Sequence, residues 1–281
     1  MIQAGRLRGG EVEHKMKIAF IGGGNMGEAM LAAVLQKGLV ASSDICISDI
    51  SPERREYLKE KYNAGITESN RNAVNGSDIV VLAVKPQVVN GIYDELKGSL
   101  KPEQLVLSII AGVKMTSICQ ELGHHRVVRV MPNTPAQVGV GMSGWTATNE
   151  VSEEQREWTR AILGAMGREI YFDDEKYLDM VTAISASGPA YFFLFAECLA
   201  QAAVDIGLPR REAEELVAQT MLGAANLLEK SGETPADLRR KVTSKGGTTE
   251  RALQVFEEGK LADLIRKAVS AAYQRAKELG S

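Results

Sequence analysis

The chain has 281 residues, 44% of them hydrophobic, which is enough for a large core and long enough for two domains. Its 33 lysines and arginines nearly balance its 36 aspartates and glutamates, and the net charge of −3 offers no basic surface for nucleic acid or an acidic membrane. The three cysteines lie far apart without CxxC spacing, which indicates buried, reduced thiols in a reducing compartment. We therefore expect a soluble, cytoplasmic protein that binds neither nucleic acid nor membrane.

The N-terminal segment 1–15 contains no apolar stretch of signal-peptide length, and we expect it to be a disordered extension. From Lys17 to about Phe172, short β-branched runs alternate with helical segments, which is typical of βαβ units that build a mostly parallel sheet. The expected strands are Lys17–Ile21, Asp44–Ser48, Asp78–Val84, Leu105–Ser108 and Val127–Met131, with shorter ones near Gly144–Thr148 and Glu169–Phe172.

Helix signals lie between these strands, such as the capping box that Ser152 forms with Gln155. In the last third of the chain the strand pattern stops, and long segments rich in Ala, Leu, Glu and Arg remain. We therefore predict an α/β fold: a Rossmann-like, doubly wound domain over residues 16–172, followed by an all-α dimerisation domain over residues 173–281.

The helix expected at Ala190–Ile206 is apolar nearly all round but carries Glu197, Gln201 and Asp205, which indicates a buried helix rather than a membrane span. Its own domain has too few helices to cover it, so an intertwined second subunit is the expected cover. The sequence thus predicts a homodimer.

A glycine-rich loop directly follows the first strand and opens an amphipathic helix. Gly22, Gly24 and Gly27 form the pattern GxGxxG, with Asn25 and Met26 between the last two glycines. Gly22 permits the tight turn, Gly24 lets the backbone approach phosphates, and Gly27 lets helix and strand pack closely. The helix N-terminus adds amide donors and a positive potential. The pattern predicts dinucleotide binding; the alternative is a turn used only for packing.

The residues after the second strand bear on the choice between NADH and NADPH. Asp49 ends that strand, where a carboxylate accepts hydrogen bonds from the adenosine ribose hydroxyls and repels a 2′-phosphate. Arg54 and Arg55 would hold the phosphate if Asp49 swung aside, although a solvated helix face explains them equally well. Asn70 either reaches the same ribose or caps its own helix. These residues therefore do not decide between NADH and NADPH.

Two more turns lie at the carboxyl ends of strands, where ligands bind in open α/β sheets. In the first, Ala83 and Val84 precede Lys85 and Pro86, and Lys85 either points into the cleft or is a surface lysine before a helix. In the second, two prolines flank Asn133 in a rigid turn suited to holding a flat nicotinamide ring, although prolines also simply end strands. Both turns are candidates for the cofactor site.

The all-α domain carries a candidate anion-binding loop before a helix expected at Arg251–Glu258. The loop consists of Ser244, Lys245, Gly246, Gly247, Thr248 and Thr249. Its glycines expose backbone amides, and its hydroxyls lie at the positive end of a helix, which together suit a carboxylate. The alternative is an ordinary N-cap loop, but two glycines exceed what capping needs. The segment Ser185–Tyr191 combines small residues with a proline, which helix packing explains as well as a ligand does.

The only histidines are His14, His124 and His125, none on an element expected to face the carboxyl ends of the strands, and no carboxylate-histidine cluster suggests a metal. A reductase with neither a histidine base nor a metal needs a substrate that accepts hydride with little acid help. A cyclic imine meets this condition because it is readily protonated to an iminium.

Five motifs, in order and at matching spacing, resemble those of the pyrroline-5-carboxylate reductase family. They are FIGGGNMG at 20–27, AVKPQ at 83–87, RVMPNTP at 129–135, SASGPAYFF at 185–193 and SKGGTT at 244–249. The resemblance covers essentially the whole chain from Lys17. It implies hydride transfer from NAD(P)H to the C=N bond of L-1-pyrroline-5-carboxylate, giving L-proline in proline biosynthesis. It also implies a homodimer, which in this family often assembles into larger rings, and it slightly favours NADPH.

Carried over by position, the resemblance assigns Gly22–Gly27 to the cofactor pyrophosphate and Ala83–Pro86 to its nicotinamide end. It assigns the substrate carboxylate to Ser244, Gly247, Thr248 and Thr249. Thr249 is the catalytic candidate, because its hydroxyl would bond the ring nitrogen and orient the imine carbon, so that catalysis is mainly positioning. Lys245 and Ala186 depart from the family's usual proline and glycine.

Two other interpretations remain. A β-hydroxyacid dehydrogenase of the same architecture would place a catalytic lysine on the long helix after the linker, but no lysine lies between Tyr177 and Lys230. A non-catalytic dinucleotide-sensing protein would keep the Rossmann domain and would have no use for the Gly246–Gly247 loop.

Overall fold

A computed structural model describes residues 16–280, so the expected disordered extension 1–15, which includes His14, lies outside the described residues. The described chain divides into two compact units, the first ending at Leu178 and the second running from Asp179 to Leu279. The division falls inside helix α7 (Lys176–Val181), a little past the boundary expected after Phe172. A boundary inside a helix leaves no loop signal in the sequence.

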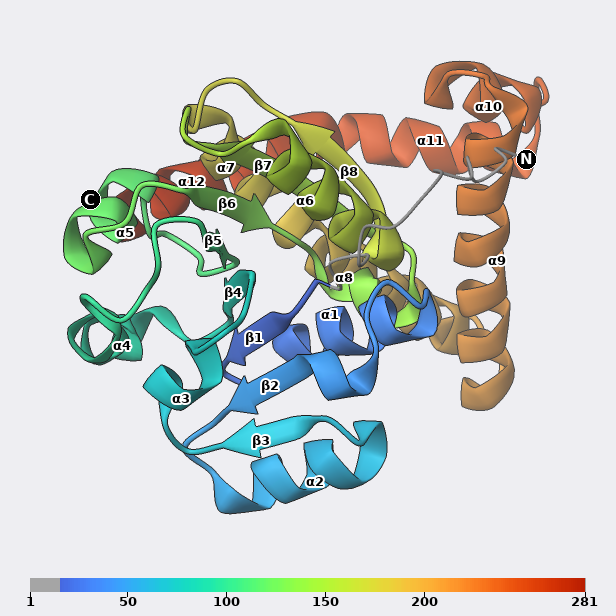
Figure 1. Cartoon of the computed structure of the whole chain (residues 1–281). Helices are drawn as coiled ribbons and strands as arrows, with labels where there is room; N and C mark the ends of the chain where they lie inside the picture. The colour runs from blue at the N-terminus through green and yellow to red at the C-terminus, as the bar shows by residue number, and fades with distance from the viewer. Residues whose placement is uncertain (1–15, 281) are drawn as a thin grey trace, which may run out of the picture. The chain divides into compact units, whose positions relative to one another are not determined.

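An eight-stranded sheet forms the centre of the first unit (Figure 1), in the order β3-β2-β1-β4-β5-β6-β7-β8. The strands are β1 Ile18–Ile21, β2 Ile45–Ser48, β3 Gly65–Thr67, β4 Ile79–Leu82, β5 Leu105–Ser108, β6 Val127–Met131, β7 Gly141–Ala147 and β8 Gly167–Tyr171. The neighbouring strands from β3 through β2, β1, β4 and β5 to β6 are all parallel. Strand β7 is antiparallel to β6, and β8 is parallel to β7. The strand order reverses between β1 and β4, which is the switch point where such sheets bind ligands. The predicted doubly wound sheet is confirmed.

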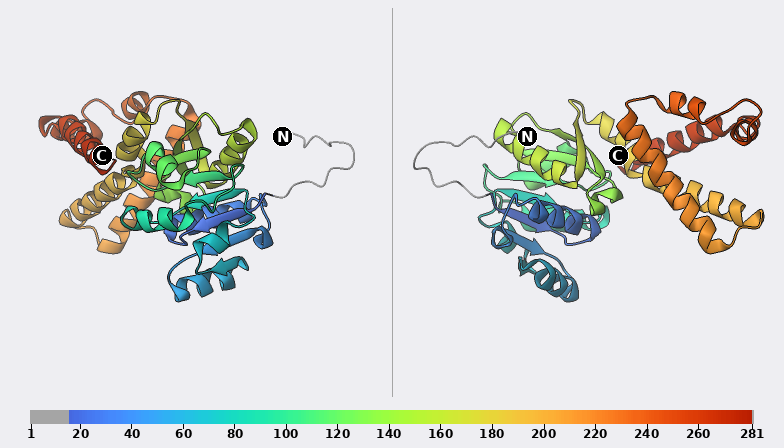
Figure 2. Two further views of the ribbon diagram at one scale, coloured as in Figure 1. Left: turned by 60° about the vertical axis from the view of Figure 1, so that its left-hand side comes forward. Right: turned by 90° about the vertical axis from the view of Figure 1, so that its right-hand side faces the viewer.

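Helices cover both faces of this sheet (Figure 2). One face packs against α1 (Asn25–Gln36), α2 (Pro52–Tyr62) and α6 (Glu153–Met166). The other packs against α3 (Asn70–Val74), α4 (Val89–Leu96) and α5 (Met115–Leu122). Within β1, Ile18 and Phe20 belong to the first core and Ala19 and Ile21 to the second, as the alternation of a strand requires.

Local signals in the sequence form the elements that they predict. All four residues of β4 are fully buried, which explains why a strand covered on both faces is apolar throughout. At the start of α6, the Ser152 hydroxyl accepts from the backbone of Gln155 at 3.2 Å, and the Gln155 side chain accepts from the backbone of Ser152 at 3.1 Å. This capping box satisfies donors that the helix itself cannot.

The second unit is all-helical, as predicted (Figure 2). Its helices are α8 (Gly188–Asp205), α9 (Arg210–Ser231), α10 (Pro235–Lys241), α11 (Thr248–Glu258) and α12 (Leu261–Leu279). A π-helical turn, η4 (Thr182–Ala186), joins α7 to α8. Helix α8 packs along α9, and η4 packs on α12.

Within the second unit, helix α8 leaves most of its apolar surface uncovered. Only Gly188 and Ala200 of this helix are buried, and Phe192 and Phe193 are each 66% exposed. Cys198 is also exposed, where a buried thiol was expected. By length and composition alone Lys176–Asp205 could cross a membrane, which is weak evidence because core helices of soluble proteins pass the same test. The second unit by itself therefore leaves this face without a cover, and large exposed apolar faces of this kind mark interaction sites.

Candidate functional site

The glycine-rich loop lies between β1 and α1 and touches the turn after β4. Gly22 has φ +96°, a conformation that other L-residues rarely adopt, and a Cβ there would lie 2.8 Å from the carbonyl oxygen of Ala83. A Cβ on Gly27 would lie 2.7 Å from the carbonyl oxygen of Gly22. A Cβ on Gly24 would meet nothing within 4 Å. The loop therefore packs tightly at Gly22 and Gly27 and borders open space at Gly24, where the phosphates are expected.

The N-terminus of α1 is available to an anion. Gly24 is its N-cap residue and no side chain caps the helix, so the amide groups of the first turn have no side-chain acceptor. Asn25 is exposed and Met26 packs partly against the first core. These features fit a dinucleotide pyrophosphate.

Asp49 and Arg54 hold the glycine loop from two sides. The Asp49 carboxylate accepts hydrogen bonds from the backbone N–H of Gly23 at 2.8 Å and of Ser51 at 2.9 Å. Nε of Arg54 donates to the carbonyl oxygen of Gly23 at 2.6 Å, and Arg55 donates to the backbone oxygen of Asp49 at 2.7 Å. The end of β2, the start of α2 and the glycine loop thus form one hydrogen-bonded unit.

Glu28, in the first turn of α1, was missed by the sequence analysis. Four donors converge on its carboxylate: Arg54 Nη2, Tyr57 OH at 3.1 Å, Lys61 Nζ at 2.9 Å and Tyr62 OH at 2.8 Å. Burial raises the pKa of Glu28, but the hydrogen bonds from Lys61, Tyr62 and Arg54 outweigh it and lower this pKa to about 2. An acid just after a glycine loop gives no sign by itself that it pairs with the following helix, α2.

Asn70 ties β2 to α4 through its side chain. Its Oδ1 accepts from the Ser48 hydroxyl at 2.5 Å, and its Nδ2 donates to Glu95 at 2.7 Å. The cap of α3 is Ser69, whose hydroxyl accepts from the backbone N–H of Asn72 at 3.3 Å, so Asn70 does not cap its own helix. A contact between Asn70 and the cofactor ribose stays a prediction.

The two turns at the ends of β4 and β6 differ in how closely they meet the glycine loop. Val84 lies beside Gly22, with its Cγ1 3.0 Å from where a Cβ on that glycine would be. Lys85 is exposed and leads into the 3₁₀ turn η2 (Pro86–Val88). Asn133 Oδ1 accepts from the backbone N–H of Met142 at 2.8 Å and precedes η3 (Thr134–Val138), which packs on α1.

The second unit carries the predicted anion-binding loop at the start of α11. The backbone N–H of Gly246 donates to the Glu250 carboxylate at 2.7 Å, and that of Gly247 donates to the carbonyl oxygen of Ser244 at 3.0 Å. Both glycine amides, which we expected to be unpaired, are thus bound within the loop. No side chain caps α11, which begins at Thr248, so the amides of its first turn and the neighbouring hydroxyls are the donors left for a ligand. Thr249 is half-buried and Lys245 is exposed.

The SASGPAYFF motif forms the junction between η4 and α8. Ala186 ends the π-helical turn, and the Tyr191 hydroxyl donates to the carbonyl oxygen of Ala183 at 2.9 Å across it. Turns of this kind are frequent at functional sites and are also explained by packing, as the sequence indicated.

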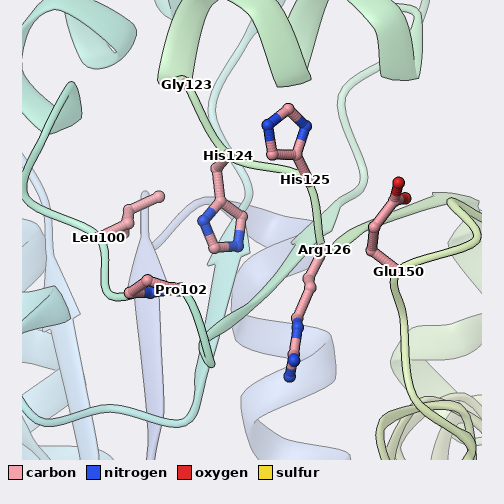
Figure 3. A pocket seen from close by; sticks show the side chains of 7 residues that line it. All are labelled: Leu100, Pro102, Gly123, His124, His125, Arg126 and Glu150. Carbon is pink, nitrogen blue, oxygen red and sulfur yellow. The ribbon is translucent and has the colours of Figure 1, made fainter.

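The described histidines, His124 and His125, lie just before β6 and line a pocket (Figure 3), whereas the glycine loop follows the carboxyl end of β1. The pocket is lined by Leu100, Pro102, Gly123, His124, His125, Arg126 and Glu150. His124 is buried, its Nε2 lies 2.7 Å from the backbone oxygen of Gln104, and burial lowers its pKa. Within residues 16–280, no group of three His, Cys, Asp or Glu side chains is placed to hold a metal ion.

Comparisons with known proteins match both units. The model of pyrroline-5-carboxylate reductase dimerisation matches residues 175–279, and that of NADP oxidoreductase, coenzyme F420-dependent, matches residues 17–112. The pyrroline-5-carboxylate reductase of Pseudomonas aeruginosa is 43% identical over 264 residues, covering 94% of this chain and 96% of that protein. The enzyme of the same name from Arabidopsis thaliana is 38% identical over 263 residues, covering 94% and 95%.

Solved structures agree with the sequence relatives. A pyrroline-5-carboxylate reductase from Coxiella burnetii has a TM-score of 0.87 at 38% identity, covering 95% of this chain and all of that one. A Plasmodium falciparum pyrroline carboxylate reductase with NADP bound has a TM-score of 0.85 at 29% identity, covering 95% and 98%. The chain therefore belongs to the pyrroline-5-carboxylate reductase family of NAD(P)H-dependent oxidoreductases.

Proposed function

We propose that this protein reduces L-1-pyrroline-5-carboxylate to L-proline with NADPH or NADH, in cytoplasmic proline biosynthesis. The observation that carries the proposal is the glycine loop: Gly22 at φ +96°, open space at Gly24 and an uncapped α1 fit a dinucleotide, in a chain whose relatives bear this enzyme's name.

The first unit is proposed to bind the cofactor. Gly24 and the first-turn amides of α1 bind the pyrophosphate, and the turns at Ala83–Pro86 and Asn133 line the nicotinamide end. When bound, the nicotinamide supplies the hydride. Its redox chemistry leaves the protein the tasks of orienting the ring and excluding water.

The loop before α11 is proposed to bind the imino acid. The hydroxyls of Ser244 and Thr248 and the first-turn amides of α11 hold its carboxylate. The amide of Gly246 donates to the Glu250 carboxylate at 2.7 Å, which is the kind of bond proposed between this loop and the substrate carboxylate. Thr249 bonds the ring nitrogen, which carries a proton while the neighbouring carbon accepts hydride. Catalysis is then mainly positioning, worth several kcal/mol at its best.

The choice of cofactor rests on opposing features. The resemblance to the family favours NADPH. The carboxylate of Asp49, pinned by the backbone of Gly23 and Ser51 at the end of β2, favours the free ribose hydroxyls of NADH. Both cofactors are therefore proposed as hydride donors.

A second copy of the chain is proposed to cover the exposed apolar face of α8, and dimers are proposed to assemble further into rings. Phe192 and Phe193 expose two large aromatic side chains on that helix, and each would add roughly 2 kcal/mol on burial. Sedimentation velocity tests the dimer: Phe193→Asp should yield monomers. Val138→Asp, at a position in the first unit that is 76% exposed, should leave the dimer intact.

The activity is tested by oxidation of NADPH and of NADH by the purified protein, which should require pyrroline-5-carboxylate. If the protein oxidised neither cofactor in the presence of pyrroline-5-carboxylate, the proposal would be wrong. Thr249→Ala should lower kcat far more than cofactor affinity, and Thr249→Ser, which keeps the hydroxyl, should recover most of the rate. If cofactor affinity fell instead, the loop would serve the dinucleotide.

A further inference from the structure

Two cations of helix α2 are already bound to an acid of helix α1. Arg54 donates through Nη2 to Glu28, and Lys61 donates through Nζ to the same carboxylate at 2.9 Å. The Glu28 side chain is 16% exposed, against 26% for Arg54 and 48% for Lys61. Glu28 is thus the fixed acceptor, and it holds two more exposed cations.

Arg54 also lies beside Asp49, the residue that follows β2. Both side chains bond Gly23: Asp49 accepts from its N–H at 2.8 Å, and Arg54 donates to its carbonyl oxygen at 2.6 Å. In a Rossmann-like sheet the adenosine ribose lies at the end of β2, so the 2′-phosphate of NADPH would arrive at these two side chains. Arg54 is therefore placed to pair with that phosphate, as is Arg55, which donates to the backbone oxygen of Asp49 at 2.7 Å.

The Arg54 guanidinium, however, is engaged on several sides. Besides its bonds to Gly23 and Glu28, it lies over the Tyr57 ring, 4.9 Å from the centroid. The hydroxyls of Tyr57 and Tyr62 donate to Glu28 as well and hold that carboxylate in place. A phosphate could reach Arg54 only through the N–H groups that these bonds do not use, close to the Glu28 carboxylate, whose negative charge would repel it.

We infer that Glu28 is a specificity-determining residue of the cofactor site: by holding Arg54 and Lys61 it withholds positive charge from a 2′-phosphate and lowers the preference for NADPH over NADH. The inference rests on the proposed cofactor site. Glu28 acts through these cations and is a positioning residue, whereas Asp49 would face the ribose itself.

The test is the effect of Glu28→Gln on binding, because this change removes the charge and keeps the size. We expect the ratio of the NADH to the NADPH dissociation constant to rise by about fivefold, the scale of one partly screened charge. The same shift is expected between adenosine 2′,5′-bisphosphate and AMP, two probes without nicotinamide. Glu60→Gln is the matched control, because it removes an exposed charge from α2 and should leave both ratios unchanged.

A second substitution tests whether Glu28 acts on cofactor preference through Arg54. In the Glu28→Gln background, Arg54→Met should remove the gain in NADPH affinity. In the otherwise unchanged chain, Arg54→Met should leave the ratio within about twofold, because the guanidinium is already committed to Glu28. Even if Glu28→Gln does not fold, a large loss of NADPH affinity in Arg54→Met alone would refute the inference.

Two results would overturn the inference: an unchanged ratio in Glu28→Gln, or a loss of about tenfold or more in NADPH affinity, with NADH affinity kept, in Arg54→Met alone. Both are read from binding. Failure to reduce pyrroline-5-carboxylate with normal binding ratios would refute the proposed function and leave this inference standing.

Discussion

Acid should weaken the first unit by protonating Glu28. The pKa of this carboxyl is about 2 in the folded chain, against an ordinary value of 4.5, because the hydrogen bonds from Lys61, Tyr62 and Arg54 outweigh the effect of burial. A pKa that is lower in the folded than in the unfolded state stabilises the fold above the unfolded value. That stabilisation is present above pH 4.5 and is lost as the pH falls toward 2.

The magnitude follows from the shift. A fall from 4.5 to about 2 is roughly 2.5 pKa units, and at about 1.4 kcal/mol per unit it sets an upper limit of about 3.5 kcal/mol. Lys61 is half exposed, so screening reduces the expected contribution to about 1–2 kcal/mol. By pH 3 less than about half of the contribution remains.

Urea denaturation at pH 7 and pH 3 measures this contribution directly. The Glu28→Gln variant should be less stable than the unchanged chain by about 1–2 kcal/mol at pH 7, and the deficit should shrink to under about half at pH 3. Glu60→Gln, at an exposed position, should show no such pH-dependent difference. A deficit of the same size at both pH values would mean that the glutamine merely packs badly, and the electrostatic reasoning would be wrong.

Three further substitutions test the cofactor site and the core. Asp49→Ser should shift the preference toward NADPH by about 1–2 kcal/mol in the ratio of kcat/KM values, and an unchanged ratio would rule out Asp49 as the selector. Tyr93→Phe should raise the free energy of unfolding by up to about 1 kcal/mol, because the Tyr93 hydroxyl is buried without a hydrogen-bond partner; a less stable variant would contradict this. Gly22→Ala should cost about 1–3 kcal/mol and most of the cofactor affinity, because of φ +96° and the Ala83 carbonyl oxygen at 2.8 Å. Gly38→Ala, at φ +66° with open space around it, isolates the conformational part, and equal losses in both would remove the close contact as a cause.

The elements that the sequence predicted well are those whose signals are local. The run Ile79–Leu82 is apolar throughout because helices cover both of its faces, and the capping box of Ser152 and Gln155 is complete within four residues. The GxGxxG pattern is also explained by local structure, because the positive φ at Gly22 and the close approach at Gly27 both arise within that loop. Such features need no knowledge of distant contacts.

The features that the sequence could not predict depend on which segments meet. Glu28 meets Arg54 and Lys61 only because α1 and α2 lie on the same face of the sheet. Asn70 is bound by Glu95, 25 residues further on, so its side chain gives no local sign of that role. The exposed face of α8 was predicted from composition, but which of its residues meet a second subunit depends on the partner's surface.

Internal carboxylates hold donors at both candidate anion sites. Glu28 accepts from Arg54 beside the expected ribose, and Glu250 accepts from the amide of Gly246 in the expected substrate loop. A donor bonded in this way is held in position and avoids the cost of an unpaired polar group before a ligand arrives. It is also unavailable to that ligand until the internal bond breaks, so affinity for the anion is lower than the count of nearby donors suggests. The two acids differ in the charge that they bind. Glu28 binds two full positive charges of a helix packed on the sheet, whereas Glu250 binds one neutral amide four residues away. Removing the charge of Glu28 should therefore change anion selectivity more than the same change at Glu250.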